Sequence, residues 1–268
     1  MIWWGSLDGG ELLDDSARPI SHLDRGFLVG EGVFETLVVN SGVPFALTRH
    51  LQRLVKSASI MGIEGLDLAV IHAAIFEVVS ANRDAVGELG RLRVTLTAGS
   101  ERPSLLVTCV TQPAWGETTT AMTVPWVRNE RSAIAGAKTT SYAENFAVVR
   151  DAQSKGVSEA LMANTVGLLC EGTTSNVFVV VDGEVLTPSL SSGCLSGVTR
   201  ELVLEWFDAK EAQLGFEVLR TADEVFLTSS TREVHPVERL DDRVLGGRPV
   251  STELRARFHE RAVQDVNP

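Results

Sequence analysis

The segment GVFETLVVNSGVPFALTRHLQRLV, residues 32–55, contains two predicted strands followed by a predicted helix. Val33–Val39 is mostly apolar and rich in β-branched residues, Val43–Leu47 is apolar, and the turn-forming sequence Asn-Ser-Gly at 40–42 separates them, as in a β-hairpin. Thr48 is a suitable N-cap for the helix, in which apolar residues recur at helical spacing. Strands that lead directly into an amphipathic helix favour a mixed α/β fold.

The rest of the chain divides into two predicted domains. Residues 113–121 contain proline, glycine and a run of threonines without periodicity, which is typical of a linker. Residues 1–112 are therefore expected to form a small N-terminal α/β domain. Residues 122–268 are expected to form a larger C-terminal domain that is richer in strands, with helices between them.

Composition excludes several classes of protein. The formal charge of -11 over 268 residues disfavours nucleic acid or an anionic membrane as a partner, since both would be repelled. The three cysteines have no CxxC spacing, and the five histidines show no metal-ligand spacing, so we expect no disulfide framework and no metal. The N-terminus lacks a basic signal-peptide region, and no apolar run approaches the ~20 residues of a membrane span. These features predict a cytoplasmic protein.

One lysine stands just before a predicted helix, in the stretch AKTTSYAENF at 137–146. Ser141 and Glu144 have the spacing of a capping box, which places Lys138 in the loop that enters the helix. Burial and the positive end of a helix both lower the pKa of an amine, as a Schiff-base lysine requires. The alternative for Lys138 is an ordinary surface lysine beside a cap.

Further residues are suited to an anion and a ring nitrogen. The sequence SGVT at 196–199 opens a predicted helix, whose first amides can bind a phosphate group. Glu171 follows a predicted strand, where its carboxylate could accept from a protonated heteroaromatic nitrogen. The alternatives are a plain helix start and an exposed strand-end glutamate. An amine, a carboxylate and a phosphate cradle together are what pyridoxal 5'-phosphate requires of a protein. Candidates for the remaining phosphate ligands are Arg53 and the hydroxyls of Ser229, Ser230 and Thr231.

Five segments in a fixed order resemble the class IV aminotransferase family, the fold-type IV pyridoxal-phosphate enzymes. That family includes branched-chain aminotransferases, D-amino acid aminotransferases and 4-amino-4-deoxychorismate lyases. The segments extend over nearly the whole chain: DRGFLVGEGVFETL (24–37), HLQRL (50–54), KTTSYAEN (138–145), CEGTTSNVF (170–178) and SGCLSGVTRELVLE (192–205).

The resemblance implies a small α/β domain joined to a larger domain with a β-barrel-like sheet, and a homodimer. It also implies pyridoxal 5'-phosphate as the cofactor, with Lys138 as its Schiff-base lysine and proton shuttle and Glu171 on its pyridine nitrogen. The implied phosphate ligands are Arg53, the backbone at Val198 and Thr199, and Ser230 or Ser229.

The reaction is predicted from finer features of the same segments. The sequence FETL, with Thr36 two residues after Phe34, is similar to the lyase branch, and Thr36 is expected to help position Lys138. D-amino acid aminotransferases carry an arginine where Ala98 stands here, and branched-chain enzymes carry a tyrosine-rich pocket, whereas this chain has one tyrosine, Tyr142. We therefore expect a 4-amino-4-deoxychorismate lyase, which releases pyruvate and 4-aminobenzoate for folate synthesis. The alternative is an aminotransferase for branched-chain or D-amino acids with a 2-oxo acid acceptor.

Two arginines are candidates for the carboxylates of this small-molecule substrate. Arg91 and Arg93 share one face of a predicted strand because side chains alternate with a period of two. Tyr142 is a further candidate substrate contact. The alternative for the arginines is an exposed polar strand face. A protein that binds the cofactor without catalysis is a third possibility, which Lys138 and Glu171 disfavour.

Overall fold

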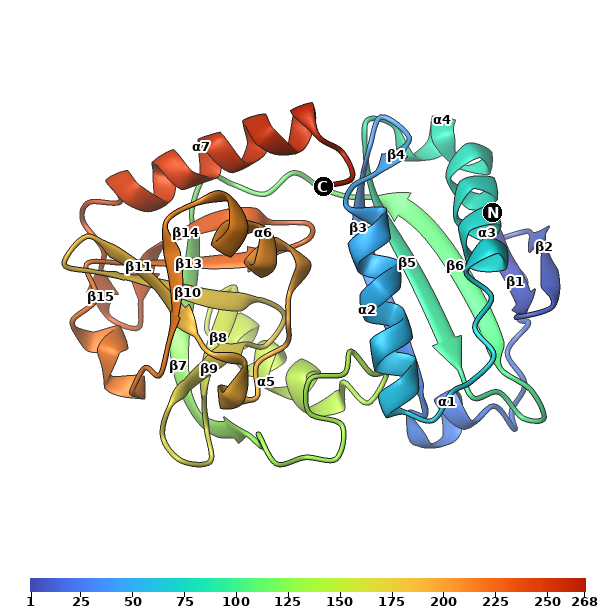
Figure 1. Ribbon diagram of the computed structural model, residues 1–268, viewed down its shortest axis with the longest axis horizontal. Coiled ribbons are helices and arrows are strands. Elements are labelled where there is room, and N and C mark those ends of the chain that lie inside the picture. The colour runs from blue at the N-terminus through green and yellow to red at the C-terminus, as the bar shows by residue number, and fades with distance from the viewer. The chain divides into compact units, whose positions relative to one another are not determined.

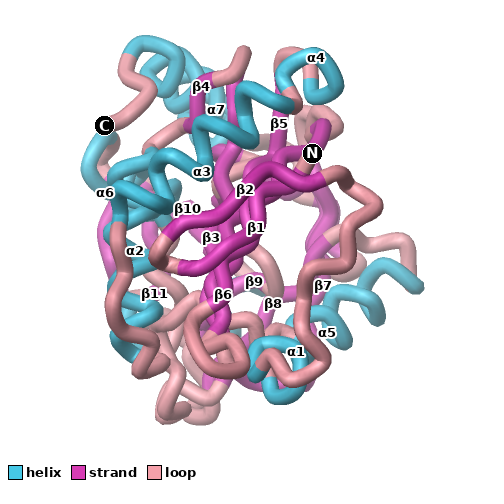
Figure 2. The backbone as a smooth tube through the Cα atoms, turned by 90° about the vertical axis from the view of Figure 1, so that its right-hand side faces the viewer, coloured by secondary structure: helices cyan, strands magenta, loops and turns pink.

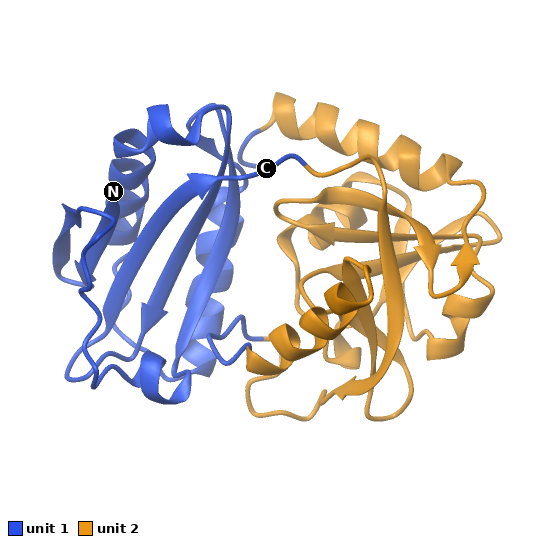
Figure 3. Ribbon diagram, turned by 180° about the vertical axis from the view of Figure 1, so that it is seen from behind, with its two compact units in different colours: residues 1–114, 137–142, 266–268 blue, residues 115–136, 143–265 orange.

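The computed structural model describes all residues from 1 to 268, and its strands form two separate sheets. Each sheet belongs to its own unit, drawn blue and orange in Figure 3. Unit 1 contains Met1–Ala114, Ala137–Tyr142 and Val266–Pro268, and unit 2 contains Trp115–Gly136 and Ala143–Asp265. A single boundary at the predicted linker 113–121 does not describe this division, because two later segments return to unit 1.

Unit 1 is built on a six-stranded sheet in the order β2-β1-β6-β5-β3-β4, in which all neighbours are antiparallel. Its strands are among those drawn in magenta in Figure 2. Antiparallel neighbours can be joined by tight turns, and β3 and β4 form the hairpin expected from the sequence. The strands are β1 Ile2–Ser6, β2 Gly9–Leu13, β3 Gly32–Asn40, β4 Val43–Pro44, β5 Leu89–Thr97 and β6 Ser104–Thr111.

Helices cover one face of this sheet (Figure 1). The long helix α2 packs on β3, and α3 packs mainly on β6. Their apolar faces and the facing strand residues form one core, which includes Leu37, Leu54, Ile75 and Leu92. The helices of unit 1 are α1 Arg25–Val29, α2 Leu47–Ile60, α3 Leu68–Ala81 and α4 Arg83–Val86.

Unit 2 is built on a mixed nine-stranded sheet in the order β12-β11-β10-β13-β14-β7-β8-β9, with β15 beside β14. The pairs β14–β7, β7–β8 and β11–β12 are parallel, and the others are antiparallel. The terminal strand β9 also contacts β10 and β11, so the sheet curls toward closure. The strands are β7 Thr119–Arg128, β8 Glu159–Asn164, β9 Leu169–Gly172, β10 Asn176–Val181, β11 Glu184–Pro188, β12 Ala209–Ala212, β13 Glu224–Ser229, β14 Glu233–Leu240 and β15 Arg243–Val244.

The curled sheet of unit 2 encloses a second apolar core that includes Leu161, Val179, Leu227 and Val237. The mixed α+β architecture in two parts agrees with the predicted fold class. The helices of unit 2 are α5 Ala143–Ser154, α6 Val198–Trp206 and α7 Pro249–Gln264, with the 3-10 turns η1 Leu190–Ser192 and η2 Phe216–Arg220. No helix combines the length and apolar character needed to cross a lipid bilayer.

The helix starts differ in how they are capped. Asp67 caps α3, where its side chain accepts from the Ala69 N–H at 2.8 Å. Thr48 does not cap α2, because the helix begins at Leu47 and the Thr48 N–H donates to Asn267 instead. The residues that decide this lie 219 positions away in the chain.

The predicted capping box at Ser141 is also wrong. α5 begins at Ala143, and the Ser141 hydroxyl donates to the Gly30 carbonyl at 3.0 Å. The predicted linker 113–121 ends inside β7, which begins at Thr119. The short elements α1 and β12 were not predicted, because they are too short to show a periodicity in the sequence.

Leu92 tests the core of unit 1, because it is fully buried in β5. Leu92→Ala should lower the free energy of unfolding by about 2–5 kcal/mol, since it removes buried methyl groups and leaves a cavity. The exposed Leu68 is the matched control, and Leu68→Ala should cost less than about 1 kcal/mol. Chemical denaturation of both variants measures the difference, and equal effects would contradict the assigned core.

Candidate functional site

Lys138 is held by its main chain along the open edge of β3. The Phe34 N–H donates to the Lys138 carbonyl at 3.0 Å, and the Thr140 N–H donates to the Gly32 carbonyl at 2.8 Å. The Lys138 N–H donates to the buried Ser57 hydroxyl of α2 at 3.0 Å. These bonds on both sides of the residue fix the backbone from which the lysine side chain projects.

Two aromatic rings border the lysine amine. Nζ of Lys138 lies 4.4 Å from the ring centroid of Phe34 and 5.4 Å from that of Tyr142. The two rings meet edge to face, with their centroids 5.3 Å apart. Aromatic rings attract a cation through their faces and displace water from its surroundings. Lys138 is half-buried as a residue, and its amine lies beside both rings.

The predicted substrate residues lie on the same face of the sheet as Phe34. Thr36 pairs with Arg93 across β3 and β5, and Val38 pairs with Arg91. Directly opposed residues of an antiparallel pair point to the same side. The guanidinium carbon of Arg93 lies 3.8 Å from the ring centroid of Phe34. The structure thus brings two cationic groups, those of Lys138 and Arg93, to one aromatic ring.

Arg53 projects into the opposite, helix-covered side of β3, where it meets Glu35. Nε of Arg53 donates to Oε1 of Glu35 at 2.8 Å, and Nη2 donates to Oε2 at 2.7 Å. Nδ1 of His50 lies 2.7 Å from Oε2 of the same carboxylate. All three side chains are buried. Of these three residues only Arg53 was predicted as a site residue, although the i, i+3 spacing of His50 and Arg53 on one helix face was a signal for a shared partner.

The charges of this cluster are well defined. Burial by itself would raise the pKa of Glu35, but the charge and hydrogen bonds of Arg53, with those of His50, outweigh it and lower the pKa to about 2. Burial lowers the pKa of His50, and this effect exceeds the opposing influence of Glu35. Glu35 is therefore an anion and His50 is neutral near pH 7, so Nδ1 of His50 carries the proton and donates to Glu35.

Glu171 lies in β9 of unit 2 and is nearly fully buried. Nε and Nη2 of Arg128, at the end of β7, both lie 3.0 Å from its Oε1. The Leu195 N–H donates to Oε2 at 2.9 Å. These donors orient a carboxylate that can accept a further hydrogen bond. Arg128 was not singled out from the sequence, because nothing near position 128 indicates that it pairs with residue 171.

The start of α6 offers backbone amides. Val198 and Thr199 occupy its first turn and are buried, and the preceding Gly197 provides no side-chain cap. The first N–H groups of a helix have no partner inside the helix. A Cβ added to Gly197 would lie 2.0 Å from Oδ1 of Asn176, so a larger residue there would require the Asn176 side chain to shift.

Asn176 connects the start of α6 to the end of β13. Its Nδ2 donates to the Leu195 carbonyl at 2.8 Å, and its backbone pairs with Thr228. The Thr228 hydroxyl is buried and has no hydrogen-bond partner. Ser229 is the last residue of β13, and Ser230 follows it. The hydroxyl-rich strand end and the helix start therefore lie on either side of one asparagine.

The predicted residues thus fall into two groups, one on each unit. Unit 2 provides an oriented carboxylate, the amides of a helix N-terminus and neighbouring hydroxyls. Unit 1 provides an amine, a buried arginine and a polar face with two further arginines. This set of donors and acceptors has the chemistry that a phosphate ester with a basic ring nitrogen and an aldehyde requires. The residues of unit 1 are Thr36, Arg53, Arg91, Arg93, Lys138 and Tyr142, and those of unit 2 are Glu171, Val198, Thr199, Ser229 and Ser230.

Residues 32–240 match the family model described as amino-transferase class IV. The chain belongs to the class IV aminotransferase family. Its relatives include a bifunctional aminodeoxychorismate lyase / D-amino acid transaminase of Mycobacterium tuberculosis, which is 31% identical over 279 residues and covers 92% of this chain and 94% of its own.

Solved structures agree with this assignment. A fold IV transaminase from Curtobacterium pusillum has a TM-score of 0.89 and 29% identity, and the match covers 100% of this chain and 99% of the other. A hypothetical aminotransferase from Mycobacterium tuberculosis, in its PLP-bound form, has a TM-score of 0.85 and 28% identity, and the match covers 95% of this chain and 97% of the other. Class IV aminotransferases depend on pyridoxal 5'-phosphate, so PLP is the cofactor of this family member.

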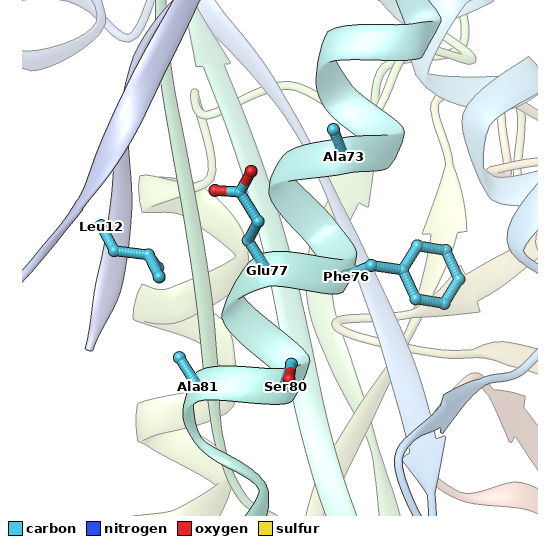
Figure 4. A pocket seen from close by; sticks show the side chains of 6 residues that line it. All are labelled: Leu12, Ala73, Phe76, Glu77, Ser80 and Ala81. Atoms are coloured by element: carbon cyan, nitrogen blue, oxygen red, sulfur yellow. The ribbon is translucent and has the colours of Figure 1, made fainter.

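A separate surface groove contains none of these residues. It has a volume of about 520 Å³ and lies between β2 and α3 (Figure 4). Its walls are mostly apolar and provide no cation. Leu12, Ala73, Phe76, Glu77, Ser80 and Ala81 line it.

Proposed function

We propose that this family member is a 4-amino-4-deoxychorismate lyase, which releases pyruvate and 4-aminobenzoate. The observation that supports this best is the placement of Lys138 and Arg93 against the same ring, that of Phe34, with Arg91 on the same sheet face. The proposed substrate carries two carboxylates, and a chain with a net charge of -11 needs a local group of cations to bind them.

The proposed cofactor ligands follow from the chemistry of each group. Lys138 would attach PLP through Nζ, and the carboxylate of Glu171 would accept from the ring nitrogen. The phosphate would be held by Arg53, by the first amides of α6 at Val198 and Thr199, and by the hydroxyls of Ser229 and Ser230. Bound there, PLP supplies an electron-withdrawing ring that stabilises negative charge on the substrate carbon.

The protein residues then carry the proton transfers. Nζ of Lys138 takes the ring proton of the substrate and returns a proton to the departing enolpyruvate. The Lys138 backbone, bonded to Phe34 and Ser57, sets the position of that amine. Phe34 and Tyr142 limit the access of water to the Lys138 amine. Thr36 lies two residues from Phe34 on the same face of β3, where its hydroxyl can help to position the amine. Formation of the aromatic product drives the reaction.

A second candidate is transamination of D-amino acids with a 2-oxo acid acceptor. The relative from Mycobacterium tuberculosis, which is described as both a lyase and a D-amino acid transaminase, favours it. Both reactions use an amine that moves a proton, so Lys138 would serve either one. They differ in the substrate that Arg91 and Arg93 would bind.

The deciding experiment follows pyruvate release from 4-amino-4-deoxychorismate by the purified enzyme without a keto-acid acceptor. Formation of pyruvate and 4-aminobenzoate in equal amounts is expected. A parallel panel of L- and D-amino acids, with 2-oxoglutarate or pyruvate as acceptor, measures transamination. No turnover of 4-amino-4-deoxychorismate, together with rapid transamination, would refute the lyase activity and support the second candidate, an aminotransferase.

We also propose that the enzyme acts as a homodimer in the reducing cytoplasm. Its three cysteines are free and buried, as suits that compartment. In α1 three consecutive apolar side chains are exposed, Phe27 at 72%, Leu28 at 57% and Val29 at 63%. A run of this kind is typical of a surface that a second copy covers.

Lys138→Ala should abolish turnover, because the variant has no amine to attach the cofactor or to move a proton. The variant should also lose the linkage to PLP that borohydride reduces in the wild-type protein. Lys155, an exposed lysine paired with Asp151, provides the control, and Lys155→Ala should retain full activity. Mass spectrometry of the reduced proteins checks the linkage, and normal turnover by Lys138→Ala would refute the mechanism.

Arg93→Leu should raise the KM for the dicarboxylate substrate by about 10–100-fold, because a charge-assisted hydrogen bond is lost. Arg102→Leu alters an arginine that pairs with Asp8 at the surface and should leave KM unchanged. Steady-state kinetics of both variants provide the comparison. A wild-type KM in Arg93→Leu would contradict the proposal that Arg93 binds the substrate.

Phe27→Asp should convert the dimer to a monomer, since a carboxylate would have to be buried at the interface without a partner. The wild-type protein should have twice the chain mass of 28.9 kDa, and the variant should have that mass once. Sedimentation velocity measures both. A wild-type monomer would refute the dimer, and an unchanged dimer in the variant would remove α1 from its interface.

A further inference from the structure

Glu35 is the least expected residue of unit 1, because it is an acidic side chain with no exposed surface in an apolar core. Its neighbours on the same side of β3 are Val33 and Leu37, which belong to that core. Replacing a buried charged group with a well-packed apolar one often stabilises a protein. A charge at this position therefore calls for an explanation other than stability.

The bonds of Glu35 define the orientation of one guanidinium group. Both oxygens of the carboxylate accept from the Nε and Nη2 edge of Arg53, at 2.8 and 2.7 Å. A paired contact of this kind fixes the plane of the guanidinium as well as its distance. His50 donates to Oε2 of the same carboxylate from one turn earlier in α2, which limits rotation of the carboxylate.

Glu35 orients the Arg53 guanidinium, but its negative charge has an opposing effect on phosphate binding. An anion beside Arg53 offsets its positive charge and would weaken its attraction for a phosphate group. An oriented guanidinium, in contrast, loses less freedom when it forms paired hydrogen bonds with phosphate oxygens. The two effects predict opposite results for the removal of the carboxylate, so an experiment can separate them.

We propose that Glu35 is a positioning residue, which orients Arg53 for the 5'-phosphate and thereby sets the preference of the protein for PLP over pyridoxal. This inference rests on the proposed role of Arg53 as a phosphate ligand. Glu35 acts through Arg53 and does not touch the reacting atoms.

The test compares two ligands that differ only in the phosphate. The apoprotein is titrated with PLP and with pyridoxal, and the two Kd values are obtained from the absorbance of the bound chromophore. Glu35→Gln should raise the Kd for PLP by about tenfold or more and leave the Kd for pyridoxal nearly unchanged, since only the phosphate of PLP uses the oriented Arg53. The preference for PLP should therefore fall by the same factor.

Two further variants complete a thermodynamic cycle. Arg53→Gln should lose at least as much preference for PLP as Glu35→Gln, and the double variant should lose no more than Arg53→Gln alone. Additive losses would mean that Glu35 does not act through Arg53. Glu35→Asp keeps the charge but shortens the side chain, so it should also reduce the preference if orientation matters.

Glu224 provides the matched control, because it is buried and accepts hydrogen bonds from Ser251 and from the Val250 N–H at the start of α7. Glu224→Gln should leave the preference for PLP unchanged, even if the protein becomes less stable. Circular dichroism establishes that each variant is folded. If Glu35→Gln does not fold, Glu35→Asp provides the deciding comparison.

The possible failures are distinguishable. A wild-type protein with equal affinity for PLP and pyridoxal would refute the phosphate site itself, and with it the role of Arg53. A wild-type preference that Glu35→Gln and Glu35→Asp retain or increase would refute the positioning role alone. An equal rise in the Kd values for PLP and pyridoxal in the Glu35 variants would mean that Glu35 has only a structural role.

Discussion

The main-chain bonds between residues 137–142 and the edge of β3 are the constraint on which the candidate site depends. A lysine in an unattached loop would sample many positions, at a cost in entropy when it had to react. Here the carbonyl of Lys138 accepts from Phe34 and its N–H donates to Ser57, so the residue is fixed as firmly as a strand residue. The sheet of unit 1 thus determines where the Lys138 amine projects.

β3 organises two environments because its side chains alternate. Phe34 and Thr36 face the polar side, where Arg93 approaches the Phe34 ring. Glu35, between them, faces the helices and holds Arg53 and His50. A shift in strand register by one residue would exchange these two sides. The core residues Val33 and Leu37 prevent such a shift, because it would expose them to water.

In unit 2, a network of hydrogen bonds holds the groups that could bind a cofactor. The segment 195–197 donates to Glu171, accepts from Asn176 and leads directly into α6. Glycine at 197 allows the backbone to approach Asn176 closely. The oriented carboxylate and the helix amides are consequently parts of one bonded network, to which Arg128 adds a fixed positive charge.

The sequence by itself determined the elements with strong periodicity, and the family through its ordered segments. It also singled out Lys138 and Glu171 as candidates, because the segments that contain them resemble those of the family. Only the tertiary structure decided that Glu35 and His50 accompany Arg53, that Arg128 accompanies Glu171, and that Ser141 bonds to residue 30 instead of capping a helix. The physical reason is that periodicity and capping reflect neighbours in the chain, whereas these partners are brought together only by folding.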